Sequence, residues 1–441
     1  MPVAAASLCA MNGNPVVWSS FPIVALAWIV IAAFPSSISS VHAAASMRVV
    51  RSVTTVGLVW MAALVALRLE AADAIAFLGA GSMLVLGFWL GRDTNGSSVA
   101  ADRLLSAAAI GYIVHAVRLL GWFVERAGWQ MADLIRLRWD PSAVEGSGLV
   151  GFGNLGNNAM LAAMLLPALV AGATRSKTWI AQAVQSVAAC LAVGVLAVTQ
   201  ARAPLVVSAA MLLATLVALR ARTMVVCLIV AGAVLMTSSV SNDSNFETNA
   251  LRRVVQLLQG VEIDASAEER AESIVLGWRL AWDNPMFGVG VSRLPNVMIH
   301  TAPHQWCLHQ ALEWGIVVGL AGAAATLAMI VAFIRALHRA WRCRELACYG
   351  LIFLSIPTTY LMIGTVAGAQ WHYGLASVWP ALCGIGFGVA WSMETRTLAR
   401  AVRGAPLAVG GVPDRPKIPA SSAPGCSCSG MRLSRKATVH D

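Results

Sequence analysis

Long unbroken apolar segments are the feature that most constrains this chain. Each runs for about 17 to 25 residues, which is the length that an α-helix needs to cross a hydrocarbon core about 30 Å thick. Such helices satisfy their own backbone hydrogen bonds, whereas barrel strands would alternate apolar and polar residues. Charged residues make up 12% of the 441 residues, against about 25% in a typical soluble domain. The sequence therefore excludes a soluble fold and predicts an all-α polytopic membrane protein.

We expect the membrane-spanning helices near 16–34, 52–68, 72–90, 103–124, 156–173, 179–198, 203–219, 223–240, 314–335, 347–367 and 372–392. The first apolar segment follows an N-terminus without the basic residues of a cleaved signal peptide, so it is expected to remain as a helix. An odd number of spans leaves the N-terminus outside, and a twelfth helix within residues 1–70 would bring it inside. The expected fold has about 11 to 12 transmembrane helices.

The positions of the basic residues predict the orientation of these helices. The net charge is +10, and the Lys and Arg residues concentrate in short connections: Arg48, Arg51, Arg92, Arg103, Arg175, Lys177, Arg220, Arg222, Arg335, Arg339, Arg342 and Arg344. All of them fall on one side when the helices alternate, and the positive-inside rule makes that side cytoplasmic. No basic stripe interleaved with aromatic residues occurs in the sequence, so membrane lipids are expected as partners and nucleic acid is not.

Polarity divides the chain into four parts. Residues 1–240 and 314–395 are expected to hold transmembrane helices, 241–313 a large loop on the outer side, and 396–441 a disordered cytoplasmic tail rich in Pro, Gly and Ser. Apolar spacing in LRRVVQLLQG and ERAESIVLGWRLAW predicts two amphipathic helices in the loop. The segment WDNPMFGVG predicts a turn that ends the second helix.

His304 is the candidate general base. It lies in TAPHQWCLHQALEWG, directly before a predicted membrane helix, where a histidine can titrate near neutral pH and remove a proton from a sugar hydroxyl. The alternative is an interfacial histidine that caps the helix. His300 and His309 are competing candidates, and Glu313 either orients His309 or has a structural role at the start of the helix.

Arg202 and Arg270 are candidate ligands for a phosphate group. Arg202 follows a membrane helix in VTQARAPLVV, at the mouth of the bundle, where its planar guanidinium can present several donors to phosphate oxygens. Arg270 begins the second amphipathic helix of the outer loop. The alternatives are an interface anchor for Arg202 and a solvated arginine, or one paired with Glu268 or Glu272, for Arg270.

His115 and Arg118 lie inside the predicted span 103–124. Ionisable groups inside a membrane usually face a polar cavity because exposure to lipid is costly. The two residues are therefore candidates for binding a substrate headgroup. Because both lie toward the outer end of the helix, side chains that reach to the membrane surface are an alternative.

Two patterns in the outer loop resemble a known family. Arg270 stands about fifteen residues before a Pro-x-x-Gly-x-Gly turn made by Pro285, Gly288 and Gly290. A second pattern consists of His304, Leu308, Glu313 and Gly315, with Gln305 where the family has Asn. Ala201–Arg202 occupies the place of an outer Ser-Arg, and NLGNNAML loosely resembles a Gly-rich, Asn-containing helix start. In their order and outer placement, these motifs between about 145 and 320 resemble the superfamily of O-antigen ligases, O-antigen polymerases and bacterial protein O-oligosaccharyltransferases.

This resemblance implies a GT-C-like glycosyltransferase of the bacterial inner membrane. Such an enzyme transfers a glycan from undecaprenyl diphosphate to an acceptor hydroxyl on the periplasmic face. His304 would be the general base, and Arg202 and Arg270 would stabilise the departing diphosphate. Direct displacement predicts inversion at the anomeric carbon. The outer loops contain no Asp-x-Asp, so no metal or other cofactor is expected.

The expected acceptor is the lipid A-core, as for an O-antigen ligase that completes lipopolysaccharide, because the outer loop is single and moderate in size. Polymerisation of repeat units and transfer to protein are alternatives with the same chemistry. A transporter of lipid-linked glycans is an alternative from another class, but it would be expected to show related halves or broken helices. No internal repeat is evident in the sequence.

Overall fold

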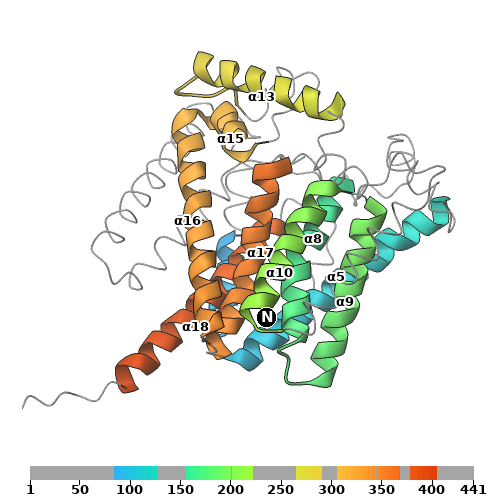
Figure 1. Ribbon diagram of the computed structural model, residues 1–441, viewed down its shortest axis with the longest axis vertical. Helices are drawn as coiled ribbons and strands as arrows, with labels where there is room; N and C mark the ends of the chain where they lie inside the picture. Colours follow the sequence, from blue (N-terminus) through green and yellow to red (C-terminus); the bar gives the residue numbers. More distant parts are fainter. Residues whose placement is uncertain are drawn as a thin grey trace, which may run out of the picture. The chain divides into compact units, whose positions relative to one another are not determined.

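The computed structural model describes residues 84–127, 155–199, 201–221, 265–290, 305–342, 345–367 and 378–404 (Figure 1). Within these ranges the regular elements are all helices. They are α5 (Ser98–Ala127), α8 (Leu155–Ala173), α9 (Trp179–Thr199), α10 (Arg202–Ala218), α13 (Ala265–Asp283), α15 (Trp306–Trp314), α16 (Ile316–Trp341), α17 (Glu345–Ala367) and α18 (Val378–Gly404). Residues 84–92 form a further helix.

These helices confirm the prediction of an all-α polytopic membrane protein. Long apolar stretches that could cross a membrane occur at Ser98–Trp122, Trp179–Thr199, Ile316–Trp341 and Glu345–Thr365. Shorter apolar helical stretches occur at Asn158–Ala173, Ala203–Ala218 and Ala381–Met393. Each of these seven stretches overlaps one predicted span. The predicted spans 16–34, 52–68 and 223–240, and most of 72–90, lie outside the described residues, as does the amphipathic segment LRRVVQLLQG.

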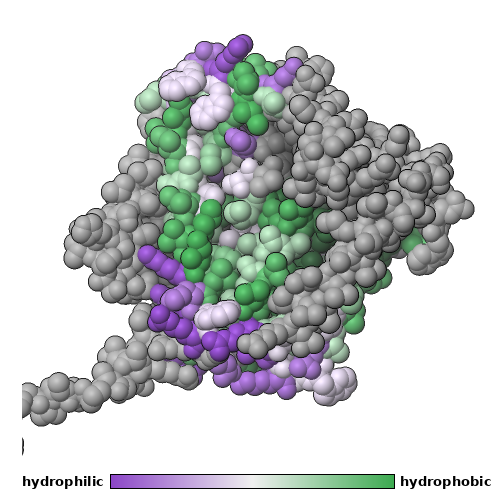
Figure 2. Space-filling view, in the orientation of Figure 1, coloured by the Kyte–Doolittle hydropathy of each residue, from purple (hydrophilic) through white to green (hydrophobic). Residues whose placement is uncertain are grey.

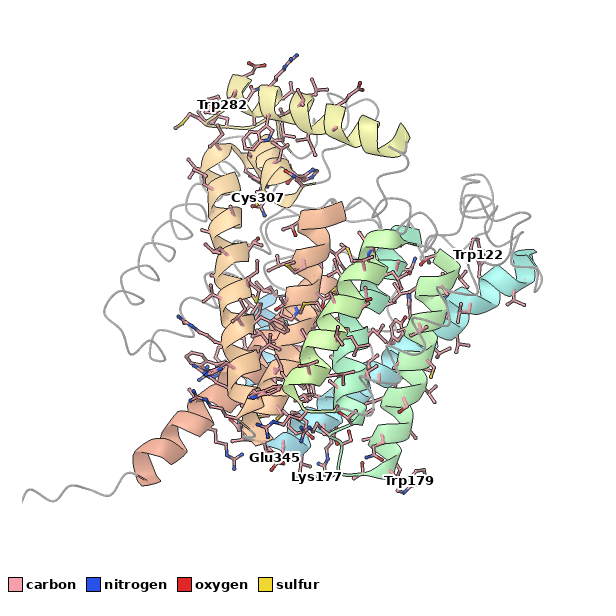
Figure 3. The ribbon with its side chains drawn as sticks, in the orientation of Figure 1. Trp122, Lys177, Trp179, Trp282, Cys307 and Glu345 are labelled. Carbon is pink, nitrogen blue, oxygen red and sulfur yellow. The ribbon has the colours of Figure 1, made fainter. Side chains whose placement is uncertain are left out.

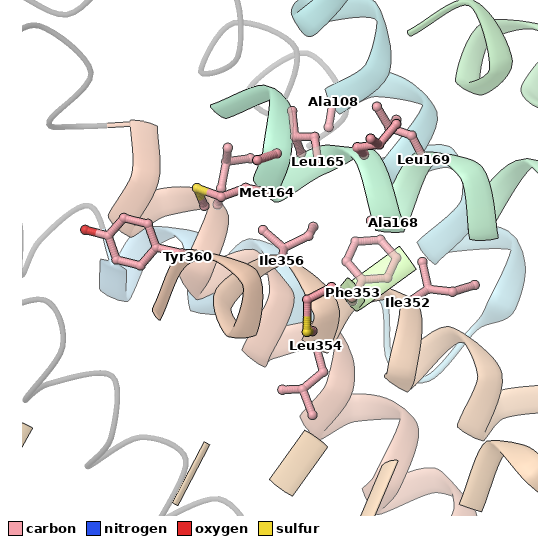
Figure 4. Packing of buried hydrophobic residues seen from close by; sticks show 14 of the residues in the cluster. Ala108, Met164, Leu165, Ala168, Leu169, Ile352, Phe353, Leu354, Ile356 and Tyr360 are labelled. Carbon is pink, nitrogen blue, oxygen red and sulfur yellow. The ribbon is translucent and has the colours of Figure 1, made fainter. Parts of the chain in front are cut away.

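Helix α8 forms the centre of the bundle and packs against α5, α9, α10 and α17. Its residues from Asn158 to Leu169 are all buried. Figure 4 shows Met164, Leu165 and Ala168 of α8 close to Ile352 and Ile356 of α17. A helix that is apolar all round belongs in the interior of a bundle, whereas a peripheral helix keeps one side exposed.

Helix α16 is peripheral. It exposes Leu320, Leu327 and Ile334, which are spaced by seven residues and therefore lie on one side. Figure 2 shows hydrophobic surface over the middle of the bundle and hydrophilic surface along its lower end. Large apolar side chains exposed in this band are expected to contact lipid.

Close glycine contacts join α18 to the helix formed by residues 84–92. A Cβ atom on Gly91 would lie 2.8 Å from the backbone nitrogen of Val389, and one on Gly384 would lie 2.7 Å from that of Phe88. Gly87 and Gly388 meet the partner backbone just as closely. Each helix thus presents a Gly-x-x-x-Gly motif, whose small residues allow backbones to approach within a membrane.

The basic connections that the structure describes meet at one end of the bundle, as the sequence predicted for them. Nζ of Lys177 lies 2.8 Å from Oε1 of Glu345, and both residues lie at the lower end in Figure 3. The guanidinium of Arg175 donates to the carbonyl of Leu219 over 2.5 Å. Arg220 stacks over the Trp341 ring at 5.2 Å. We call this end, with residues 92–97, 174–178, 219–221, 339–342 and Glu345, the basic end.

At the basic end, α18 is hydrogen-bonded to the turn that follows the helix of residues 84–92. The Thr94 and Ser392 hydroxyl oxygens lie 2.8 Å apart, and the Arg396 guanidinium donates to the carbonyl of Gly96 over 3.0 Å. A buried carboxylate lies at the same end, where Asp102 accepts hydrogen bonds from Ser176 and Gln185. Such bonds compensate the cost of burying a charged group.

The outer segment ERAESIVLGWRLAW forms a helix, α13, and WDNPMFGVG forms the turn that ends it, as predicted. The N–H of Gly288 donates to the carbonyl of Asn284 over 2.9 Å. Gly288 and Gly290 have φ values of +64° and +97°, a conformation that side chains with a Cβ atom rarely adopt. The two glycines are thus required by the path of the chain.

Three backbone hydrogen bonds clamp this turn to the next two helices. The N–H of Val289 donates to the carbonyl of Leu312 (2.5 Å), and that of Gly290 to the carbonyl of Glu313 (3.2 Å). The N–H of Ile316 donates to the carbonyl of Pro285 (2.8 Å). These bonds satisfy carbonyls at the end of α15 and an amide at the start of α16, groups that have no partner within their own helices. We call this set of contacts the backbone clamp.

A short helix precedes α16, where the sequence predicted the start of a membrane span at 314. Gly315 has a φ of +93° and separates α15 from α16. Helix α15 then folds back along α16, because a Cβ atom on Gly319 would lie 2.8 Å from the carbonyl oxygen of Cys307. A Cβ atom on Gly322 would meet the side chain of Gln310. Hydropathy locates the apolar span but does not show that the helix before Gly315 folds back along it.

The backbone clamp predicts that Gly288→Ala destabilises the protein. The new Cβ atom would lie 2.6 Å from the backbone of Glu313 at a residue with positive φ, and the expected loss is at least about 2 kcal/mol. Thermal unfolding in detergent, followed by fluorescence-detected gel filtration, would measure it. Gly121→Ala is the matched control, because that Cβ atom would meet nothing within 4 Å. Equal melting temperatures for the two variants would contradict the prediction.

Candidate functional site

The candidate site lies where α13 packs on the helical bundle, at the end opposite the basic connections. Helix α13 lies across α15 (Figure 1). Ala281 of α13 packs with Leu308, Ala311 and Leu312 of α15 in a small separate core. This core and the backbone clamp hold the outer helix on the end of α16. We call α13, the turn 284–290 and α15 together the seam.

A buried histidine–carboxylate pair lies within α15. Nε2 of His309 is 3.0 Å from Oε1 of Glu313, and the two side chains are 4% and 1% exposed. Residues four apart face each other on a helix, and the contact gives each polar group a partner away from water. Glu313 also contributes its backbone carbonyl to the clamp, so it lies at the end of α15 and not at the start of the membrane helix. Neither side chain is open to solvent in this geometry.

Cys307 lies on the same short helix (Figure 3) and is partly buried. Burial raises the pKa of its thiol. The thiol is therefore protonated at neutral pH and is a poor nucleophile, since the thiolate is the reactive form.

The two arginines predicted to bind phosphate, Arg202 and Arg270, both lie at the end of the structure where the seam is. Arg202 is the first residue of α10, whose other end reaches the basic end beside Arg220. Arg270 lies in the first half of α13, the helix that packs on α15. For both arginines the structure describes the backbone and not the side chain. Their backbones thus share the end of the molecule at which the seam is built.

His300 and His304 lie outside the described residues. Gln305, which follows His304 directly, is the N-cap of α15 with an extended backbone. The structure therefore brings the described part of this motif, from Gln305 to Gly315, into the seam.

His115 makes a buried contact between two helices of the bundle. Its Nε2 atom lies 2.9 Å from Oδ1 of Asn158, and both side chains are almost fully buried. Asn158 belongs to the NLGNNAML segment, so this polar segment supplies a partner on α8 for a histidine on α5. Arg118, three residues further along α5, is exposed. The two residues therefore face different surroundings.

One of these contacts was not predicted from the sequence. The pairing of His115 with Asn158 joins residues that are 43 positions apart, and only the polar character of each residue within an apolar segment hinted at it. The pairing of His309 with Glu313 was one of the two alternatives stated for Glu313, and it agrees with their spacing of four residues.

Within the residues that the structure describes, no three His, Cys, Asp or Glu side chains gather closely enough to hold a metal ion.

The comparison with known protein families agrees with the expected resemblance. Residues 162–323 match the family described as O-antigen ligase. This segment runs from α8 through the first turns of α16 and includes Arg202, Arg270, the backbone clamp and α15. No curated protein matches the chain. The matched segment and the motifs of the outer loop thus agree in their similarity to the O-antigen ligase superfamily.

Proposed function

We propose that the protein is an O-antigen ligase. In this proposal it transfers a glycan from undecaprenyl diphosphate to a sugar hydroxyl of the lipid A-core, on the periplasmic face of the bacterial inner membrane. The general activity, a glycosyltransferase-like ligation, follows from the family. The donor, the acceptor and the chemical steps are proposals that rest on the placement of residues in the chain.

The observation that carries this proposal is that the basic connections and the candidate site residues lie toward opposite ends of the bundle. The described basic connections meet at one end of the bundle, which the positive-inside rule assigns to the cytoplasm. Arg202, at the start of α10, and Arg270, on α13, belong to helix segments that begin toward the opposite end, and both lie within the matched segment. A lipid-linked diphosphate lies at the membrane surface, so cationic groups at that end are suitably placed to bind it.

The proposed reaction is a single displacement. His304 removes the proton from the acceptor hydroxyl, the oxygen attacks the anomeric carbon, and the bond from that carbon to the diphosphate oxygen breaks. The negative charge that develops on the diphosphate is stabilised by Arg202 and Arg270. The reaction inverts the anomeric carbon and needs no covalent intermediate. The hydrophobic bundle would hold the polyprenyl chain.

The residues of the seam support this chemistry because they hold α15, the helix that directly follows the His304 segment. The His309–Glu313 pair and the backbone clamp fix α15, whose N-cap Gln305 directly follows His304 in the chain. We assign His309 and Glu313 a positioning role on this ground. His115, Arg118 and His300 stay candidates for contacts with the substrate.

Alanine substitution tests the three central residues. Arg202→Ala, Arg270→Ala and His304→Ala should each lower glycan transfer about a hundredfold or more, because they remove charge stabilisation or the general base. The measurement is transfer in proteoliposomes that contain purified donor and acceptor, with gel filtration to check folding.

Two variants are matched controls for these substitutions. Arg279→Ala changes an exposed arginine of α13, and His338→Ala changes an exposed histidine near the basic end. Both should keep normal transfer. Undiminished transfer by His304→Ala would exclude His304 as the base. Loss of transfer in the two control variants would show that the effect is not specific to the three central residues.

The proposed mechanism uses no metal ion. Addition of EDTA to the purified enzyme in lipid should leave the initial rate of transfer unchanged, because arginines neutralise the diphosphate. A rate that falls with EDTA and recovers on addition of Mg²⁺ would refute this part of the mechanism.

The acceptor is tested by the lipopolysaccharide of a deletion strain. Loss of a ligase should remove every band of the O-antigen ladder, because no glycan reaches the lipid A-core. Loss of a polymerase should leave a core that carries a single repeat unit, and an unchanged ladder with loss of glycoprotein would indicate a protein acceptor. Transport of the lipid-linked glycan without formation of product would favour the transporter.

A further inference from the structure

Helix α13 exposes apolar side chains on a face that does not pack on α15. Val275, Trp278 and Trp282 are all exposed, and Trp282 keeps 68% of its surface accessible. Their spacing of three and four residues places them on one side of the helix. We call these three residues the apolar stripe.

The other faces of α13 are already occupied or charged. Ser273 and Ala281 are buried on the side that meets α15. Glu272, Arg279 and Asp283 are exposed, and helical geometry places them on a third side, which they share with the exposed Leu276, beside the apolar stripe. The helix therefore has one face for α15, one for water or charged groups, and one that is apolar but uncovered.

The apolar stripe continues the lipid-facing surface of the bundle. The hydrogen bond from Ile316 to the carbonyl of Pro285 fixes the end of α13 at the first turn of α16, and Figure 3 shows Trp282 at this end. Leu320 and Leu327 of α16 are exposed on the lipid-facing side of the helix that begins there. The stripe thus lies where the hydrophobic belt of α16 reaches its end.

Its composition suits the boundary between lipid headgroups and acyl chains. Tryptophan combines a large apolar ring with a polar N–H group and is enriched at membrane interfaces. A helix with an apolar face beside a charged face lies in the plane of this boundary, with the charges among the headgroups. The charged side of α13 next to the stripe gives the helix this pattern.

We propose that the apolar stripe of α13 docks into membrane phospholipid, in the leaflet that surrounds the seam end of the bundle. Trp278 and Trp282 enter the headgroup–acyl boundary, and Arg279 and Asp283 stay among headgroups and water. The seam is then held at a fixed depth, because the backbone clamp joins α13 to α16. This inference concerns ordinary phospholipid and does not depend on the proposed glycosyl transfer.

Site-specific photocrosslinking tests this surface. Trp278→p-benzoylphenylalanine and Trp282→p-benzoylphenylalanine are compared with the same replacement of Arg279, which lies between them in sequence on the charged side of the helix. Replacement of Leu327 on α16 gives the level for a lipid-facing residue. Each full-length variant is reconstituted in vesicles of phosphatidylethanolamine and phosphatidylglycerol without glycolipid, and irradiated. Gel filtration selects folded protein.

The expected yield of phospholipid adducts at 278 and 282 is close to that at 327 and several-fold above that at 279. Equal yields at 278, 279 and 282 would overturn the proposal. Crosslinks from 278 or 282 to a second copy of the chain, in place of lipid, would also overturn it and would indicate a protein interface.

The native chain provides a second measurement that needs no substitution. Vesicles that contain a diazirine-bearing phospholipid are irradiated, and mass spectrometry locates the adducts. Adducts on Val275, Trp278 or Trp282 support the docking of α13. Adducts on α16 together with an unlabelled α13 would reject it.

Discussion

The backbone clamp between residues 285–290 and the corner at Gly315 is the constraint on which the outer part of this protein depends. It joins three helices through main-chain groups alone, so its geometry is set by where the chain can bend and not by the size of side chains. Gly288 and Gly315 allow the bend because their positive φ angles and close backbone contacts exclude a Cβ atom. The small core of Ala281 with Leu308 and Leu312 then fixes the remaining freedom of α13.

Much of the fold could be predicted because the relevant signals are local. The length of an apolar segment fixes a membrane helix, and the predicted 179–198 and 347–367 lie within two residues of α9 and α17. The second amphipathic helix and its turn were predicted for the same reason, since apolar spacing, Pro285 and Gly288 act on their immediate neighbours. The common placement of the basic connections followed from alternation across the membrane.

The rest depends on contacts between distant segments. Nothing near Gly384 indicates that it meets the helix of residues 84–92, and His115 finds Asn158 only when α5 and α8 lie together. The corner at Gly315 was missed because hydropathy locates a membrane span but not a short helix that folds back along its start. For the candidate site, motif order indicates which segments to expect there, and the roles of their residues stay predictions. The side-chain positions of Arg202 and Arg270 depend on tertiary packing, which motif spacing does not encode.

The two ends of the bundle differ in when they can be completed during synthesis. The backbone clamp joins residues fewer than forty positions apart, so the seam can assemble soon after α16 has entered the membrane. The hydrogen bonds of Thr94 with Ser392 and of Arg396 with Gly96 join residues about three hundred positions apart, and they must wait for α18. Contacts with large sequence separation form late in folding. The helix of residues 84–92 therefore lacks its glycine contacts until α18 has been made. If synthesis stops before α18, the seam can be assembled while these contacts are still missing.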